Sequence, residues 1–244
     1  MTNQWQSFLI ALQFLTTIPV RLLEPVKPKN IGYSIVYYPL VGIIIGGIML
    51  LCIYLLNSQS PLVSAVLTLS IWIALTGGLH LDGLADSADA WLGGLGDKEK
   101  TLRIMKDPAS GPIAVVILLM VLLIKFVMLA ELIQQQQWLS IVATVVLARM
   151  ALPMLLLSTP YVRHGGLGST LVGNLPHQPL RIMLSLTSFL ALILINFIAL
   201  AVFLMALLVL RYYMIKRLDG TTGDTAGAML EILETISLIS FVII

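Results

Sequence analysis

Charged residues and cysteine are both scarce in this chain. Asp, Glu, Lys and Arg make up only 11% of the 244 residues, whereas hydrophobic residues make up 59%. An ordinary soluble domain has about 25% charged and about 45–50% apolar residues, so this composition excludes that class of protein. With one cysteine, Cys52, the chain forms no internal disulfide. The composition indicates a polytopic α-helical membrane protein, and the mean hydropathy of +1.00 agrees.

Two further features are missing. Residues 1–20 contain no basic stretch followed by a cleavage site, so we expect no signal peptide. The apolar runs are continuous and do not alternate over about ten residues, which excludes a barrel of the outer-membrane type. The short, partly amphipathic run at 4–20 is expected to lie at the membrane interface.

Long apolar runs dominate the rest of the chain. Several approach or exceed the ~18–20 residues that a helix needs to cross a bilayer. Neither an internal repeat nor a linker separates them, so we expect a single integral membrane domain over residues 1–244. The expected spans are 33–56, 61–78, 112–132, 138–158, 182–210 and 225–244.

The run at 182–210 is too long for one span. As a single helix it would measure roughly 44 Å, against a hydrocarbon core of ~30 Å. We therefore expect two short or re-entrant helices that turn near Asn196, which makes about seven spans; one tilted helix would make six.

The positions of Lys and Arg predict the orientation. Cytoplasmic loops are rich in these residues, and the loops at 57–60 and 133–137 contain none. Counting spans alternately places the N-terminus in the cytoplasm and, with seven spans, the C-terminus outside. The basic groups that this counting places on the cytoplasmic side are Arg21, Lys27, Lys29, Lys98, Lys100, Arg103, Lys106, Arg163 and Arg181.

Three aspartates follow the second apolar run. On a helix, Asp82, Asp86 and Asp89 occupy positions i, i+4 and i+7 and lie within roughly 60° of one another. Like charges on one helix face repel each other, and a hard divalent cation such as Mg²⁺ would remove that cost. The alternative is a solvated helix end with three incidental aspartates. His80, just before this face, is either a polar anchor or a substrate contact.

Basic residues near these carboxylates suggest a phosphate site. Lys106 can neutralise a phosphate, Asp107 can join a metal site, and Gly111 ends the same loop. Arg163 lies in a glycine-rich segment that can meet a phosphate. Arg149 stands in the middle of an apolar run, where a charge needs a partner.

A second acidic cluster precedes and enters the last apolar run. Gly223 and Asp224 are followed by Glu231, which lies on the same helix face as Asp224, and by Glu234. Carboxylates inside a membrane usually face the interior of the bundle and mark functional sites. For Glu234 an internal ion pair with Lys125 or Arg149 is an equal alternative. Asp224 is expected to share one cytoplasmic opening with the first cluster.

Four polar segments stand out between the apolar runs. In chain order they are GGLHLDGLADSADAW (77–91), IMKD with SG (104–111), PYVRHGGLG (160–168) and GTTGDTAGAMLEILE (220–234). Together they resemble the cobalamin synthase family, the adenosylcobinamide-GDP ribazoletransferases. The resemblance covers residues 38–234 and departs from the family at Ala90, Ala109 and Pro112.

The resemblance implies an Mg²⁺-dependent enzyme of the bacterial or archaeal cytoplasmic membrane. Such an enzyme joins adenosylcobinamide-GDP to α-ribazole or its 5′-phosphate and releases GMP. It implies membrane lipid as surroundings and no nucleic-acid partner, and it is compatible with a homo-oligomer. By resemblance Asp82, Asp86 and Asp89 form the metal and pyrophosphate site. For the mechanism, our hypothesis is that either Asp89 or Asp224 is the general base. The residues matched to substrate binding are Lys106, Asp107, Gly111, Gly223 and Glu231, with His80, Arg149 and Arg163 as further candidates.

Two other functions remain open at this point. A CDP-alcohol phosphotransferase also uses clustered aspartates and Mg²⁺, but its aspartate spacing differs and includes an Arg that this chain lacks. A cation transporter can also carry intramembrane acids. Against it, most acids here stand beside Lys and Arg, which would repel a cation.

Overall fold

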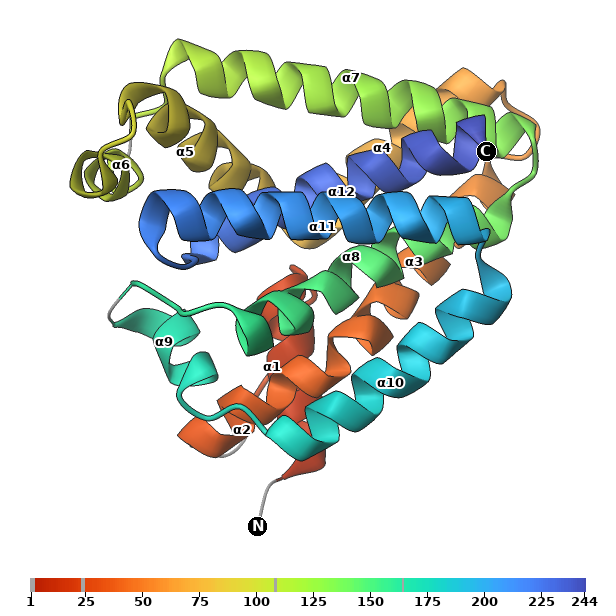
Figure 1. The fold of residues 1–244 in the computed structure, drawn as a ribbon. Helices are drawn as coiled ribbons and strands as arrows, with labels where there is room; N and C mark the ends of the chain where they lie inside the picture. Colours follow the sequence, from red (N-terminus) through yellow and green to blue (C-terminus); the bar gives the residue numbers. More distant parts are fainter. Residues whose placement is uncertain (1–2, 23–24, 108, 164) are drawn as a thin grey trace.

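The computed structural model describes residues 3–22, 25–107, 109–163 and 165–244. Within these ranges the chain forms twelve α-helices and one 3₁₀ helix, and its only β-type pairing is an isolated parallel bridge between Tyr161 and Thr221. The expectation of an all-α, polytopic helical bundle is confirmed (Figure 1).

Six helical segments of the described chain are long and apolar enough to cross a membrane. The first runs from Pro28 to Leu55 and joins α2 (Pro28–Ser34), η1 (Ile35–Tyr37) and α3 (Tyr38–Leu55). The other five are α7 (Pro112–Gln134), α8 (Trp138–Ser158), α10 (His177–Leu194), α11 (Phe197–Leu218) and α12 (Gly223–Ile243).

A bent pair of helices supplies the seventh candidate span. Neither α4 (Pro61–Thr76) nor α5 (Leu79–Gly93) is long and apolar enough to cross a membrane alone, but the two together are. The bend between the two helices is 87°. The bend falls at Gly77 and Gly78, whose φ angles of +65° and +68° lie in the left-handed region. Side chains with a Cβ rarely adopt this conformation. The aspartates that follow the second apolar run therefore lie on a helix of their own.

The predicted turn near Asn196 is confirmed. α10 ends at Leu194, and the Asn196 side chain accepts a hydrogen bond of 2.8 Å from the Ile198 N–H at the start of α11. The expectation that both helices would be short was wrong, because each continues past the apolar run into polar sequence. As a result α10 has 18 residues and α11 has 22.

This turn returns the basic end of α11 to the other basic loops. Lys98, at the start of α6 (Lys98–Ile104), forms an ion pair of 2.6 Å with Asp219. Arg217 donates a hydrogen bond of 2.9 Å to the Trp91 carbonyl oxygen at the end of α5. One continuous span over 182–210 would have placed these partners at opposite ends of the bundle.

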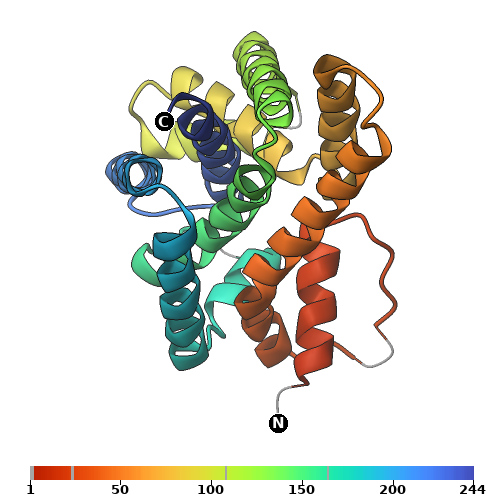
Figure 2. The same cartoon turned by 90° about the vertical axis from the view of Figure 1, so that its right-hand side faces the viewer.

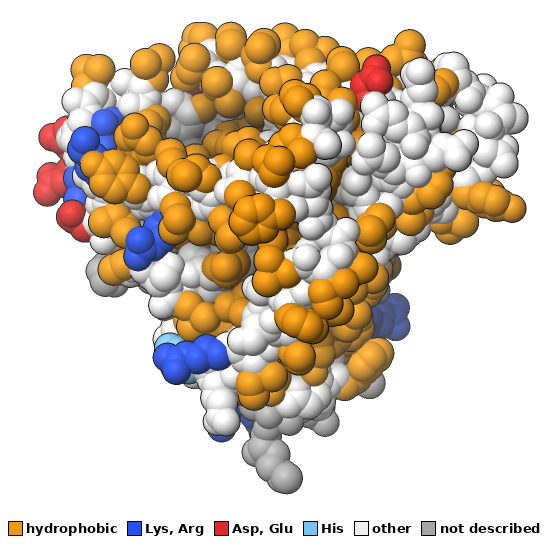
Figure 3. Space-filling view, turned by 45° about the vertical axis from the view of Figure 1, so that its right-hand side comes forward, with side chains coloured by type: hydrophobic (Ala, Val, Ile, Leu, Met, Phe, Trp, Pro, Cys, Tyr) orange, Lys and Arg blue, Asp and Glu red, His pale blue; other side chains and the backbone are white. Residues whose placement is uncertain are grey.

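Short helices gather near the basic end. α6 and α9 (Gly166–Val172) lie at the end where α5, α8 and α11 finish and where α7 and α12 begin (Figure 1). α1 (Gln4–Leu15) packs beside α2 and α3. In the space-filling view, most of the visible Lys, Arg, Asp and Glu side chains lie on one side, whereas hydrophobic side chains are spread over the rest of the face (Figure 3).

α12 is the most enclosed of the candidate spans. In α12, 72% of the most apolar 18-residue stretch is buried, whereas in α10 only 11% of the corresponding stretch is buried. α5, α7, α8 and α11 pack around α12, while α10 and α11 lie at one edge of the bundle (Figure 2). Functional groups carried by α12 are therefore held by neighbours on several sides.

The helix order predicts which loops share a side of the membrane. In a Cys52→Ala background, single cysteines at Gln136 and Asn196 should react with an impermeant thiol reagent from one side. Cysteines at Glu99 and Gln178 should react from the other side. Labelling of right-side-out and inverted vesicles measures this. A cysteine at position 196 that reacts from neither side would contradict the turn between α10 and α11.

Candidate active site

The acidic helix α5 crosses the start of α12 at very short range. A Cβ built on Gly83 would lie only 2.7 Å from the Asp224 carbonyl oxygen, and one on Gly227 would lie 3.3 Å from the Cα of His80. Real Cβ atoms do not approach other atoms as closely as the first distance, so Gly83 is required for this crossing. The crossing brings Asp224 beside the aspartates of α5, as expected from the sequence.

Local interactions fix the position of Asp224. The Thr222 side chain accepts a hydrogen bond from the Thr225 N–H and caps α12, and the Thr225 hydroxyl accepts one from the Thr222 N–H. The bridge between Tyr161 and Thr221 ties this turn to the segment after α8. Asp224 follows in the first helical turn, where a negative charge interacts favourably with the helix dipole.

Arg163 is the partner of this carboxylate. It donates a hydrogen bond of 2.9 Å to Asp224, and both side chains remain partly exposed to solvent. His164, next in the same motif, lies outside the described residues.

The α5 carboxylates repel one another. Asp82, Asp89 and Asp224 place negative charges around the carboxylate of Asp86, and Arg163 places one positive charge near it. A cation bound here would reduce the repulsion between the carboxylates. The site therefore holds more negative charge than its own residues neutralise.

Asp89 also has a structural role. Its carboxylate accepts hydrogen bonds from the Gly111 N–H and, at 3.0 Å, from the Ala114 N–H, and so caps the start of α7. A Cβ on Gly111 would lie 2.8 Å from the carboxylate, which explains the glycine. Asp107 is exposed and accepts a hydrogen bond of 3.0 Å from the Ala109 N–H.

Asp224 borders two cavities. One, of about 190 Å³, is also lined by Lys106, Arg163 and Thr222, and it carries two cationic side chains. The other, of about 220 Å³, has Asp82, His80, Gly223 and otherwise mostly apolar residues in its wall. The first has the chemistry to bind phosphate groups, because guanidinium and ammonium groups pair well with phosphate oxygens.

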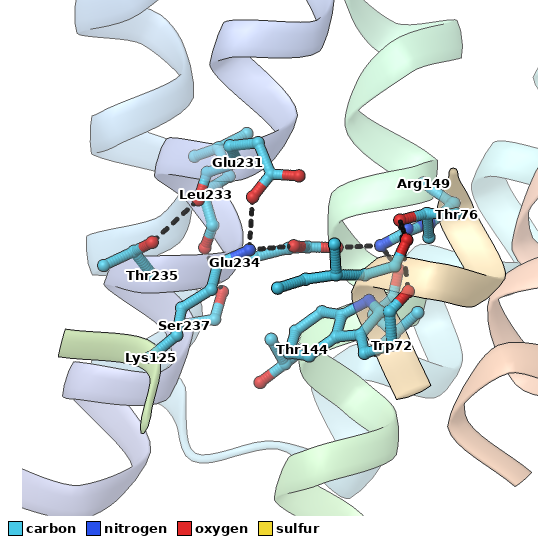
Figure 4. A network of polar contacts seen from close by, with 12 residues as sticks. Trp72, Thr76, Lys125, Thr144, Arg149, Glu231, Leu233, Glu234, Thr235 and Ser237 are labelled. Carbon is cyan, nitrogen blue, oxygen red and sulfur yellow. Dashed lines mark hydrogen bonds and ion pairs between the residues drawn. The ribbon is translucent and has the colours of Figure 1, made fainter. Parts of the chain in front are cut away.

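A network of buried charges lies deeper in the bundle (Figure 4). Lys125 of α7 forms ion pairs with Glu231, at 2.5 Å, and with Glu234 of α12, and it lies 4.6 Å from the ring centroid of Trp72. Glu234 also pairs with Arg149 of α8. The network joins four helices and balances two positive with two negative charges.

This network changes the interpretation of two predicted site residues. Arg149 and Glu231 were expected to contact substrate, but their charges are engaged in ion pairs inside the bundle, and both side chains are buried. The alternative for Glu234, an internal pair with Lys125 or Arg149, is confirmed with both partners. Of the predicted residues, the structure brings together Asp82, Asp86, Asp89, Asp224, His80, Gly223, Arg163 and Lys106.

Several lining residues were missed in the sequence. Phe14 and Tyr38 stack at 6.2 Å between ring centroids in the wall of the second cavity, and Tyr161 also lines it. Tyr161 belongs to the segment PYVRHGGLG (160–168), so its place at the site could have been predicted from the sequence. Phe14 had no such signal, because it stands in an ordinary amphipathic segment far from the acidic residues in the chain.

The predicted Mg²⁺ ion would need ligands from substrate and water as well as from the protein. Within the described residues, no three His, Cys, Asp or Glu side chains are grouped closely enough to hold a metal ion by themselves. Mg²⁺ usually takes only one or two protein carboxylates and completes its shell with water and substrate phosphates. The side chains of Asp82 and Asp86 form no hydrogen bond or ion pair within the described chain, so their carboxylate oxygens are available for this purpose.

The fold and the site together define an integral membrane helical bundle with an acidic, phosphate-compatible site at its basic end. The model of a family described as cobalamin-5-phosphate synthase matches residues 7–242. The chain therefore belongs to the cobalamin-5-phosphate synthase family.

Curated relatives agree over nearly the whole chain. A protein of Pseudomonas fluorescens is 51% identical over 93% of this chain and 95% of its own length. One of Stutzerimonas stutzeri is 50% identical over 93% of both chains, and one of Pseudomonas aeruginosa is 49% identical over 98% of this chain and 99% of its own. All three are named adenosylcobinamide-GDP ribazoletransferase. No solved structure matches this one.

Gly83 should not tolerate a side chain. Gly83→Ala forces α5 and α12 apart and should lower the free energy of unfolding by about 1–3 kcal/mol, the usual cost of overpacking. Thermal unfolding in detergent measures this loss. Gly47→Ala is the matched control, because a Cβ there meets nothing within 4 Å. Equal unfolding temperatures for the two variants would contradict the close crossing.

Lys125 should be essential for stability. Lys125→Met leaves two buried glutamates with one cation, and we expect a loss of about 3–5 kcal/mol. The double variant Lys125→Met with Glu231→Gln removes the unpaired charge and should recover most of that loss. Unfolding of both variants in detergent tests the network. If Lys125→Met alone were as stable as the parent protein, these charges would not be buried together.

Proposed function

We propose that this protein is an adenosylcobinamide-GDP ribazoletransferase. It transfers the cobinamide-phosphate part of adenosylcobinamide-GDP to α-ribazole or its 5′-phosphate and releases GMP. The observation that carries this proposal is the crossing of α5 and α12, which joins the aspartates of α5 to Asp224 beside a cavity with Lys106 and Arg163. The family match and the names of the relatives support it, and they support neither alternative function.

We also propose that the basic end of the bundle faces the cytoplasm. Loops rich in Lys and Arg are retained on that side of a bacterial membrane, and the basic residues of α6, α11 and the loop after α8 gather at this end. The active site then opens to the cytoplasm of a bacterial or archaeal cell, and the N-terminus lies on the same side. A nucleotide-linked substrate would reach the site from there.

The cationic cavity would bind the pyrophosphate. Lys106 and Arg163 line it together, and Arg163 already pairs with Asp224. Charge builds up on the phosphate oxygens as the bond to GMP breaks, and fixed cations stabilise that charge. These two residues would therefore both position the diphosphate and assist departure of GMP.

Asp224 is the general base that the geometry favours. It borders both cavities, so it can lie between a phosphate in one and a hydroxyl group in the other. Asp89 is less suited, because its carboxylate already accepts two backbone hydrogen bonds at the start of α7. Asp224 would take the proton of a ribose hydroxyl while the oxygen of that hydroxyl forms a bond to the cobinamide-linked phosphorus. The bond from that phosphorus to GMP breaks in the same step.

Mg²⁺ fits this set of carboxylates. Asp82 and Asp86 would hold the ion, and Asp89 lies on the same helix face. Asp82, Asp89 and Asp224 place negative charges around Asp86, and a cation would neutralise this charge. When bound, Mg²⁺ would supply charge neutralisation of the pyrophosphate and of the leaving phosphate. The neutralised site would then admit an anionic substrate among four aspartates.

Asp82 should be required for transfer. Asp82→Asn removes one of the proposed metal carboxylates, and we expect the rate of GMP release to fall at least ~100-fold while the protein remains folded. The assay supplies adenosylcobinamide-GDP and α-ribazole to membranes and measures corrinoid product and GMP over a range of Mg²⁺ concentrations. Chelation of Mg²⁺ should stop the parent enzyme.

Asp219→Asn is the matched control. Asp219 is an exposed aspartate at the same end of the bundle, and its left-handed conformation suits Asn equally well. This variant should retain the parent rate. Full activity of Asp82→Asn at ordinary Mg²⁺ would overturn the assignment of the metal site.

A further inference from the structure

We propose that the cavity of about 220 Å³ between α1, α3, α5, α8, α9 and α12 binds the aromatic base of α-ribazole. This inference rests on the proposed function and assigns a place to the acceptor. Hereafter this cavity is called the base cavity. Its wall includes Phe14, Tyr38, His80, Leu152, Leu156 and Leu171.

The base cavity changes from polar to apolar with depth. Asp82 and Gly223 in its wall are exposed to solvent, and the partly buried Asp224 lies beside Gly223. Tyr38, with 1% of its surface exposed, and Leu152, with 5%, are buried. A nucleoside has the same gradient, since its ribose is polar and a benzimidazole base is largely apolar. The base would enter first, and the ribose hydroxyls would remain beside the two carboxylates.

The volume of the cavity suits one part of the substrates. Pockets for drug-sized ligands usually measure ~300–1,000 Å³, and this cavity measures about 220 Å³. It is therefore too small for a corrinoid ring and large enough for a bicyclic base. The stacked rings of Phe14 and Tyr38, with an interplanar angle of 16°, line a wall that a planar base can contact.

His80 provides a polar group in this apolar setting. The side chain is 96% buried, and its Nδ1 atom has no hydrogen-bond partner among the described residues. An unpaired buried polar atom is costly and indicates a missing partner. A benzimidazole nucleoside keeps one free ring nitrogen, which accepts a hydrogen bond. We assign His80 as the donor to that nitrogen.

The position of Asp224 links the two halves of the reaction. Asp224 borders the cationic cavity with Lys106 and Arg163 as well as the base cavity. A ribose hydroxyl held at the mouth of the base cavity would then face the phosphate groups in the cationic cavity. The proposed base would lie between the attacking oxygen and the phosphorus that it attacks.

Filling the base cavity should weaken the binding of α-ribazole and leave the binding of adenosylcobinamide-GDP unchanged. Leu156→Phe adds volume to the wall, and we expect the KM for α-ribazole to rise about 10–200-fold, the usual range for a misfit in an apolar pocket. The KM for adenosylcobinamide-GDP should stay within about twofold. Leu186→Phe, on the exposed surface of α10, is the matched control and should change neither constant.

Four further variants make the result specific. Lys106→Ala should raise the KM for adenosylcobinamide-GDP and leave that for unphosphorylated α-ribazole unchanged. Leu156→Ala enlarges the cavity and should increase kcat/KM for nucleosides with bulkier bases relative to α-ribazole, which keeps the test informative even if Leu156→Phe does not fold. His80→Leu should raise the KM for α-ribazole, and His80→Asn, which retains a donor, should recover part of the loss.

Calorimetric binding of α-ribazole separates the two levels of the proposal. If the parent protein binds α-ribazole and Leu156→Phe weakens this binding at least tenfold, the base cavity is supported even in the absence of turnover. If the parent enzyme is active and both Leu156→Phe and Leu156→Ala have the parent's KM for α-ribazole, the base cavity is overturned. The transferase proposal then stays intact. A parent protein that binds α-ribazole but forms no GMP with both substrates would overturn the transferase proposal instead.

Discussion

The close crossing of α5 and α12 is the contact on which the site depends. Gly83 lies against the backbone of Asp224, and Gly227 lies against His80, so the two helices approach to backbone contact. Larger residues would separate the helices and move the carboxylates apart. The same crossing leaves a cavity on each side of Asp224, one cationic and one apolar. Helix packing and site chemistry thus have the same cause.

The buried charges stabilise the helix that carries Asp224. Glu231 and Glu234 of α12 are held by Lys125 and Arg149 from two neighbouring helices. Charges in an apolar interior are tolerated only when each has a partner. Because the partners come from α7 and α8, the pairing also selects how α12 is rotated between them. Rotation of α12 decides in turn which direction Asp224 faces at its start.

Much of the fold could be predicted because long apolar runs and bilayer thickness leave few choices. The turn near Asn196 followed from the length of one run, and the pairing of Glu234 followed from the cost of a lone buried charge. The roles of Arg149 and Glu231 could not be assigned in this way. A charge within an apolar run indicates that a partner exists, but whether that partner is a substrate or another helix depends on packing.

The sequence by itself determined the helical membrane class, the family and the face that carries Asp82, Asp86 and Asp89, because helix periodicity and hydropathy are local properties. Only the tertiary structure decided that Gly77 and Gly78 turn this face by 87° away from α4. It also decided that Phe14, remote in the chain, shares a cavity with Asp224. The bend depends on the backbone angles that the two glycines adopt, which helix periodicity and hydropathy do not specify. The shared cavity depends on distances between residues far apart in sequence, which are set by side-chain packing.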